Sequence, residues 1–305
     1  MNDRTLDVVV VGGANTDYLV RGQTLPGPGS TVDGDEFQEA AGGKGANQAV
    51  AAARLGARVA FVGRVGDDAR GRAILATLES EQVDVQHVTT DDDAETGVAL
   101  VMVDAGGQKQ IMTAPGANHR LTVEDIARAS DVITAARVLL LQLEVPLDAI
   151  ESAAQLGRSA GALVVLDPAP PRPLPERLLH QLHVIRPNAA EAEAITGIRV
   201  TDEASAKDAA LHLMARGAGA AIVGAPGGNL LVTSDEELWV PHTKVRAVDS
   251  TGAGDAFAAA IAVSLSRGEP LSRAVRFASA AAAAKTRKLG AQAGLPRREE
   301  VLQLL

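Results

Sequence analysis

Residues 249–257 read DSTGAGDAF, and this stretch decides the fold prediction for the whole chain. It joins a Gly-Ala-Gly turn to an acidic residue, Asp255, at the start of an apolar helical run. Glycines allow consecutive backbone amides to point to one side, and the helix dipole adds partial positive charge at the same place. The pattern predicts an anion hole for phosphate oxygens, in which Asp255 accepts the proton of an attacking hydroxyl. An ordinary helix start, with an acid that complements the dipole, is the alternative interpretation.

A second glycine-rich stretch, GGKGANQAV, covers residues 42–50. It is not the phosphate-binding P-loop, which needs Gly, four residues and then Gly-Lys-Ser/Thr, because Gly45 follows Lys44. Glycines on both sides of a lysine indicate that the backbone approaches a ligand closely, with Asn47 projecting from the first turn of the following helix. A tight turn with a solvated lysine explains the same spacing equally well.

Polar residues also follow several predicted strands. Asn15 and Asp17 come after the β-branched run at residues 6–11, Glu144 ends LLLQLE, and Asn188 and Glu191 follow VIRP. Because ligands bind beyond the carboxyl ends of parallel strands, these residues are candidates for a ligand site. Local explanations also exist, since Asn and Asp favour turns and the Asn188–Glu191 spacing suits a helix capping box. The first strand is not followed by G-x-G-x-x-G, which disfavours a dinucleotide oxidoreductase.

The wider pattern predicts an α/β fold. Expected strands lie at residues 6–11, 58–65, 137–143, 162–166, 183–186 and 219–224. Expected helices lie at 45–55, 68–81, 146–159, 188–196, 204–216, 253–266 and 271–286. Regular alternation of strand and helix indicates a parallel sheet with right-handed crossovers. Two hairpin-like regions, at about 16–40 and 96–113, indicate one small sheet inserted into this larger fold.

Composition limits the class of protein. The 305 residues are 46% apolar but contain only four Phe, one Tyr and one Trp, so the core must consist of Ala, Val, Leu and Ile. The net charge is −9 and no basic stripe is present, which argues against nucleic-acid binding. No cysteine is present to form a disulfide or a thiolate metal site, and the six histidines lack zinc spacing. No apolar run reaches the ~18 residues of a membrane span, so we expect a cytoplasmic protein.

In this order, the motifs resemble the ribokinase (PfkB-type) carbohydrate kinase family. The resemblance runs from VVVVGGANTD to LGAQAGLPRREEV, which is nearly the whole chain. It implies a three-layer α/β/α fold with a mostly parallel central sheet and a small β-sheet lid, in one kinase domain covering residues 1–305. It also implies ATP-dependent phosphorylation of D-ribose to ribose 5-phosphate, and a homodimer formed through the lid.

The resemblance also implies roles for individual residues. Asp255 would be the general base, and the amides of Gly252, Ala253 and Gly254 would form the anion hole. The sugar site would consist of Asn15, Asp17, Gly42, Gly43, Lys44, Asn47, Glu144 and Asp255. ATP would contact Asn188, Gly224, Ala225, Gly227, Gly228, Gly254 and Ser279, with Glu191 holding Mg²⁺ through water. A monovalent cation, K⁺, would bind beside the anion hole, mostly to backbone atoms of Asp249, Thr251, Lys285, Lys288 and Gly290.

Two departures from the family pattern affect these roles. Pro226, in the expected nucleotide loop VGAPGGN, lacks an amide donor. Gly294 stands where the family pattern usually has a hydroxyl, so K⁺ activation is expected only at high concentration. The alternatives are a kinase for another furanose or a nucleoside, and a sensor of sugars or nucleotides that has no catalytic activity. The sequences QLE at 142–144 and DPAP at 167–170 favour ribose, by resemblance.

Overall fold

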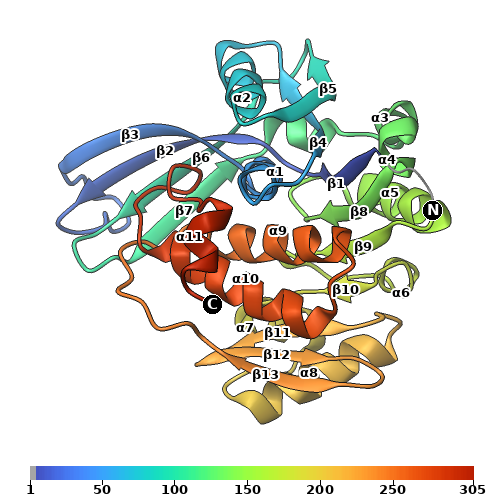
Figure 1. The fold of residues 1–305 in the computed structure, drawn as a ribbon. Helices are drawn as coiled ribbons and strands as arrows, with labels where there is room; N and C mark the ends of the chain where they lie inside the picture. The colour runs from blue at the N-terminus through green and yellow to red at the C-terminus, as the bar shows by residue number, and fades with distance from the viewer. Residues whose placement is uncertain (1–4) are drawn as a thin grey trace.

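The computed structural model describes residues 5–305, so the first four residues of the expected domain lie outside the described residues. Two separate sheets organise the molecule (Figure 1). The large sheet has nine strands in the order β13-β12-β11-β10-β9-β8-β1-β4-β5. Neighbouring strands are parallel except along β11, β12 and β13, which pair antiparallel. The strands are β1 (Leu6–Val11), β4 (Val59–Gly66), β5 (Val83–Asp91), β8 (Ala136–Leu141), β9 (Leu163–Leu166), β10 (Val184–Ile185), β11 (Ala221–Ala225), β12 (Gly228–Val232) and β13 (Glu237–Pro241).

Helices cover both faces of the large sheet and enclose a hydrophobic core on each side. Side chains of a strand alternate between the two faces of the sheet. In β1, Val8 and Val10 therefore belong to one core and Val9 and Val11 to the other. One core contains residues of α1 (Lys44–Arg54), α2 (Ala69–Ser80), α9 (Ala253–Ser266), α10 (Leu271–Thr286) and α11 (Arg298–Leu302). The other contains residues of α3 (Val123–Arg128), α4 (Ser130–Thr134), α5 (Leu147–Ser159), α6 (Glu176–Leu179), α7 (Ala189–Thr196) and α8 (Glu203–Ala215).

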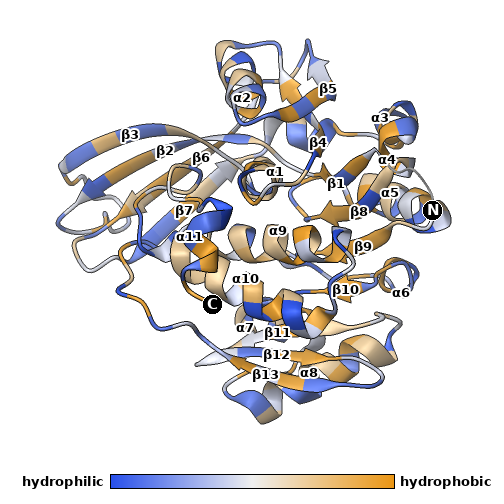
Figure 2. Cartoon of the chain, in the orientation of Figure 1, coloured by the Kyte–Doolittle hydropathy of each residue, from blue (hydrophilic) through white to orange (hydrophobic). Residues whose placement is uncertain are grey.

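These layers confirm the predicted three-layer fold. Figure 2 shows largely hydrophobic strands in the large sheet, as expected for parallel strands buried on both faces. Helix α9 is apolar almost all round, and it is buried between the sheet and the helices α1 and α10. Among residues 5–305, no helix combines the length and apolarity that crossing a membrane would need.

The small sheet forms the predicted lid, which projects from one end of the body (Figure 1). Its strands, in the order β3-β2-β6-β7, are β2 (Asn15–Gly22), β3 (Gly34–Gly42), β6 (Gly97–Val103) and β7 (Lys109–Ala114). Asn15 at the start of β2 lies opposite both Gly42 and Gly97. The lid therefore joins the body beside the end of β1 and the start of α1, where the candidate site lies.

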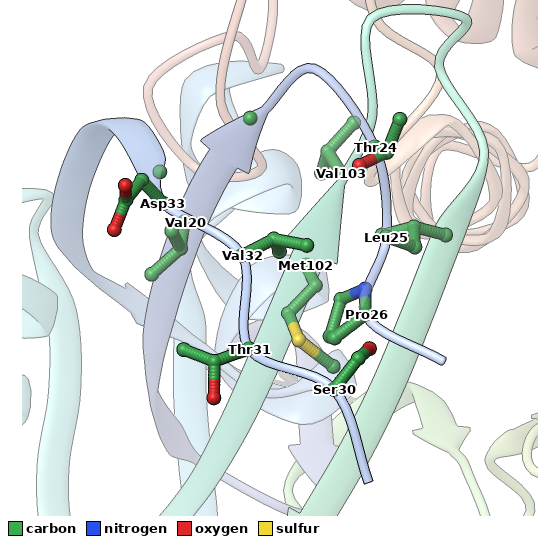
Figure 3. A pocket seen from close by; sticks show the side chains of 12 residues that line it. Val20, Thr24, Leu25, Pro26, Ser30, Thr31, Val32, Asp33, Met102 and Val103 are labelled. Carbon is green, nitrogen blue, oxygen red and sulfur yellow. The ribbon is translucent and has the colours of Figure 1, made fainter. Parts of the chain in front are cut away.

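The two faces of the lid differ. Ala99, Val101 and Val103 of β6 form a small apolar cluster, and Ala99 and Val101 face the cavity between the lid and the body. On the outer face, the loop at residues 23–33 folds back across the strands and closes a cavity of about 260 Å³. Figure 3 shows Val20 and Met102 from the strands in this cavity, together with loop residues. It lies away from Asp255 and contains none of the predicted site residues.

Three strands were not predicted. Strand β5, with the sequence VDVQHVTTD, is an edge strand in which several polar residues hide the strand pattern. Strands β11, β12 and β13 pair antiparallel in chain order. From the sequence, the turn between β11 and β12, at Pro226-Gly227, is interpreted only as a nucleotide loop. The predicted helices at 253–266 and 271–286 agree with α9 and α10, and most other boundaries differ by one or two residues.

Candidate active site

Helix α1 begins in a sharp turn that brings it against the end of β1. Gly43 has φ +85°, and a Cβ there would lie 2.6 Å from the Cα of Ala14, so a larger residue would strike backbone. The amide of Lys44 donates to Oε2 of Glu144 at 2.7 Å, which fixes the turn to the loop after β8. The first turns of α1 are thereby directed at the start of α9.

Two side chains of α1 hold the carboxylate of Asp255, which is 5% exposed. Asn47 Nδ2 donates to Asp255 Oδ2 at 2.9 Å, and Gln48 Nε2 donates to Asp255 Oδ1 at 3.2 Å. Gln48 Nε2 also donates to Asp167 Oδ2 at 2.9 Å, while Gln142 Nε2 donates to Gln48 Oε1 at 2.8 Å. This chain of amides fixes the orientation of the carboxylate. Gln48 was not among the predicted site residues, although it lies within the quoted glycine-rich stretch.

A cavity of about 640 Å³ lies between the lid and the body, and it brings most of the predicted sugar-site residues together. Its predicted members are Asn15, Asp17, Gly43, Lys44, Asn47, Glu144 and Asp255. Gly42 does not line the cavity. A Cβ there would lie 2.2 Å from Asp17 Oδ2, so the lack of a side chain leaves room for the Asp17 carboxylate. Asn118, which was not predicted, donates from Nδ2 to Asn15 Oδ1 at 2.8 Å and so orients Asn15.

Several carboxylates surround the Lys44 ammonium in this cavity. Burial raises the pKa of Glu144 to about 7, although the Lys44 charge and amide oppose the shift. Burial and the charge of Asp255 raise the pKa of Asp17 to about 6. Burial disfavours the Lys44 ammonium, but the charges of nearby carboxylates, Asp255 first, outweigh it and hold the pKa of Lys44 above its ordinary value. Lys44 therefore stays charged and balances part of the negative charge of the cavity.

Helix α9 begins at the predicted anion hole. Its N-cap, Gly252, has φ +81°, a left-handed conformation that suits glycine, and Gly252 also lines the cavity of Asp255. The amide of Ala253 differs from expectation, because it already donates to the carbonyl of Ser250 at 3.1 Å. Gly252 and Gly254 remain as the predicted amides that could face a phosphate.

An unpredicted arginine stands beside this helix start. A Cβ at Gly254 would lie 3.3 Å from Nη1 of Arg186, so the guanidinium sits against the anion hole. The guanidinium stacks 4.5 Å from the ring centre of Phe257, and Nη1 lies 3.7 Å from Asp167 Oδ1. A planar guanidinium held in this way suits phosphate oxygens. Only its position after β10 could have pointed to it in the sequence.

A second cavity, of about 350 Å³, lies on the other side of the helix start. It contains Gly254 and Ser279 of the predicted nucleotide contacts, together with Arg186, Asn229 and other residues near α9 and α10. Ala225, Gly227 and Gly228 belong to the β11–β12 hairpin and do not line this cavity. Gly224 and Asn188 do not line it either, but they lie side by side and next to Asn229, since a Cβ at Gly224 would be 3.3 Å from Asn188 Cα and 3.5 Å from Asn229 Oδ1.

Asn188 and Glu191 form the capping box of α7. Asn188 Oδ1 accepts from the amide of Glu191, and the two oxygens of Glu191 accept from the amide and Nδ2 of Asn188 at 2.8 and 2.7 Å. Each carboxylate oxygen has a second lone pair, which can accept from a Mg²⁺-bound water. Among residues 5–305, no cluster of three or more His, Cys, Asp or Glu could hold a metal directly. The arrangement fits Mg²⁺ that keeps its waters and binds mainly to substrate phosphates.

The residues expected to bind K⁺ are arranged differently from the prediction. The side-chain ammonium of Lys285 lies among them and donates to the carbonyls of Asp249 and Lys288, both at 3.1 Å. Gly290 contributes its amide, which donates to Asp249 Oδ2 at 3.0 Å. Asp249 Oδ1 accepts from the amide of Thr251 at 3.0 Å. The residues present do not fit a bound monovalent cation, because a lysine ammonium fills the place between the carbonyls.

The lid reaches the same loop. Nζ of Lys109, at the start of β7, donates to Asp249 Oδ1 at 3.2 Å and also to the hydroxyl of Thr251. Lys109 lines the larger cavity, and it was not among the predicted site residues. The lid thus places a positive charge next to the predicted anion hole.

Comparison with known proteins agrees with this geometry. A family model described as pfkB family carbohydrate kinase matches residues 5–298. The fold and the site define a carbohydrate kinase, and the chain belongs to the pfkB family. Ribokinase from Haemophilus influenzae is 37% identical over 299 residues, which cover 98% of each chain. Deoxyribokinase from Salmonella typhi is 36% identical over 254 residues, which cover 83% of each chain. A structure of Arabidopsis thaliana ribokinase complexed with ribose and ATP superposes with a TM-score of 0.89 at 32% identity, covering 98% of each chain.

Proposed function

We propose that this chain transfers a phosphoryl group from ATP to the 5-hydroxyl of D-ribose. The observation that carries the proposal is the position of Asp255. Its carboxylate lines the larger cavity, while the same first turn of α9 lines the second cavity through Gly254. A hydroxyl bound in the first cavity and a phosphate bound in the second would meet at this turn.

Each group at the turn has a proposed role. Asp255, oriented by Asn47 and Gln48, accepts the proton of the attacking hydroxyl, which contributes roughly 10²–10⁴-fold to the rate. The amides of Gly252 and Gly254 stabilise the charge on the transferred phosphoryl group, and the Arg186 guanidinium adds to this charge stabilisation. Mg²⁺, held through water by Glu191, would neutralise phosphate charge when bound.

The sugar is proposed to bind under the lid. Asp17, Asn15 and Glu144 supply acceptors for its hydroxyls, and the charge of Lys44 favours the ionised form of Glu144. Apolar residues on the inner face of β6 and β7, such as Val101 and Ile111, exclude water from the closed site. We propose one kinase domain, with the lid as its mobile cover.

The outer face of the lid supports a proposed homodimer. Leu100 and Met112 are opposite one another in the β6–β7 register and are 48% and 71% exposed. Phe37 of β3, 64% exposed, pairs with Val20 and stacks on Tyr18. An exposed apolar face on a sheet of this kind suits burial against a second copy.

The decisive experiment is an assay of ADP release over a panel of D-ribose, 2-deoxyribose, fructose and nucleosides. We expect the highest kcat/KM for D-ribose, and loss of turnover in Asp255→Asn. The similarity to a deoxyribokinase makes 2-deoxyribose the second candidate, and a higher kcat/KM for that sugar would reassign the substrate. Binding of sugar without any phosphoryl transfer would favour a sensor and refute the kinase.

A further inference from the structure

A lysine side chain is buried beneath the predicted anion hole. Lys285, in the last turn of α10, has a side-chain exposure of 0%. Its Nζ donates to two backbone carbonyls, those of Asp249 and Lys288, and lies 3.8 Å from Asp249 Oδ2. An ammonium removed from water costs free energy unless it is paired and hydrogen-bonded, so this site is built around the charge.

The surroundings are shaped for that ammonium. A Cβ at Gly294 would lie 2.7 Å from the carbonyl oxygen of Gly290, 2.9 Å from Lys285 Cε and 3.0 Å from Nζ. Any side chain at position 294, a hydroxyl included, would therefore meet both the Gly290 carbonyl and the end of the lysine side chain. The glycine that departs from the family pattern and the buried lysine fit one another as a pair.

The ammonium acts on the loop that leads into α9. Asp249 presents its carbonyl to Lys285, while its carboxylate accepts from the amides of Thr251 and Gly290. The amides of Val248 and Asp249 both donate to the carbonyl of Thr286, which ties the loop to the end of α10. Thr251 follows Asp249 by two residues, and the next residue, Gly252, is the N-cap of α9.

The charges in this cluster support a fixed ion pair. The pKa of Asp249 is raised by burial, but hydrogen bonds from Thr251 and the charge of Lys285 outweigh it and hold the pKa well below its ordinary value. Asp249 is therefore a carboxylate at neutral pH. Burial holds the pKa of Lys285 below its ordinary value; the Asp249 charge opposes that shift and the charge of Lys109 adds to it.

We infer that the Lys285 ammonium is a built-in cation, which holds the Asp249–Gly252 loop and its amides in the phosphate-binding arrangement. The kinase then needs no monovalent cation from solution. Lys285 is a positioning residue, because it acts on the phosphoryl group only through the loop. The inference rests on the proposed function and replaces the K⁺ activation expected from the sequence.

The first test compares initial rates at saturating D-ribose and MgATP in K⁺ and in tetramethylammonium at equal ionic strength. We expect equal rates for the wild-type chain. Lys285→Ala, which leaves an opening among the carbonyls, should lose roughly 10–10³-fold in kcat, because the donors of the anion hole are no longer held in place. Its KM for ribose should change little, and K⁺ or ammonium ions should restore kcat while tetramethylammonium does not.

Two further variants make the result specific. Lys285→Met keeps the length of the side chain without its charge, so it should lose kcat without rescue by K⁺. Lys207→Met removes an exposed lysine of α8 that pairs with Glu237, and it should behave as wild type in both buffers. A wild-type rate that depends on K⁺, or normal kcat in Lys285→Met, would overturn the inference.

A readout without turnover separates this inference from the proposed function. Calorimetry of ADP binding, without sugar, should give the same affinity in K⁺ and tetramethylammonium for the wild-type chain. For Lys285→Ala the affinity should be higher in K⁺. If the wild type binds ADP in this way but phosphorylates no ribose, the proposed substrate is wrong and the built-in cation stands. K⁺-dependent ADP binding by the wild type refutes the built-in cation whatever the substrate.

Discussion

Gly42→Ala should damage sugar binding without removing any functional group. Gly42 is buried at the end of β3, directly opposite Asn15 in the lid register. A Cβ at this position would lie 2.2–2.3 Å from all three atoms of the Asp17 carboxylate group. No real Cβ makes such contacts, so the methyl group must push the Asp17 carboxylate out of its place in the cavity.

The size of the effect follows from what Asp17 is proposed to do. A hydrogen bond to a charged group contributes about 1.5–3 kcal/mol, which corresponds to about 10- to 150-fold in affinity. We therefore expect the KM for ribose to rise by that factor, while the KM for ATP changes little. Gly106→Ala is the matched control in the same lid, because a Cβ there would meet only Asp104, at 3.3 Å.

A double-mutant cycle decides whether the methyl group acts through Asp17. Asp17→Ala removes the carboxylate that the methyl group would strike, so Gly42→Ala should add almost nothing in the Asp17→Ala background. Steady-state kinetics with ribose and ATP varied separately provide the four values. Additive effects of the two substitutions, or a change confined to the KM for ATP, would refute the reasoning.

Three other predictions concern the base, pH and assembly. Asp255→Asn should lower kcat by roughly 10²–10⁴-fold with an unchanged melting temperature, and near-normal turnover in the pure variant would exclude it as the base. The pKa values of Asp17 and Glu144 are raised to about 6 and about 7, so kcat/KM for ribose should fall as the pH drops from 8 to 5. These carboxyls take up protons more readily in the folded chain than in the unfolded chain, so their contribution to the free energy of unfolding should increase over the same drop in pH. A flat pH profile of kcat/KM would show that neither group titrates in sugar binding. Light scattering should give a dimer for the wild type and a monomer for Met112→Glu, and a monomeric wild type would rule out the proposed lid interface.

The sequence predicts those parts of the fold whose signals are local. Helices α9 and α10 have the predicted bounds because a glycine turn precedes one and Pro270 precedes the other. Strand β5 was missed because edge strands carry polar residues that weaken the alternation. Strand β12 was missed because the glycines of the β11–β12 turn also suit a nucleotide loop.

Contacts between residues far apart in the sequence limit how much of the site could be predicted. The predicted sugar-site residues that line the cavity come from motifs that are visible in the sequence, and the structure brings them together. The partners that orient them were not visible, since Gln48 meets Asp255 across 207 positions and Asn118 meets Asn15 across 103. From the sequence, mainly backbone atoms of Lys285 are expected in the cation site. No local pattern reveals that its side chain turns inward toward Asp249.

The contact of Lys109 with Asp249 and Thr251 connects the position of the lid over the proposed sugar site with the positive charge beside the proposed phosphate site. Lys109 belongs to the lid, whereas its two partners belong to the body, so the contact depends on the position of the lid. Any outward swing of β7 would withdraw one positive charge from the loop before α9. With that charge withdrawn, the site would stabilise a transferred phosphoryl group less well, and transfer to water would be slower.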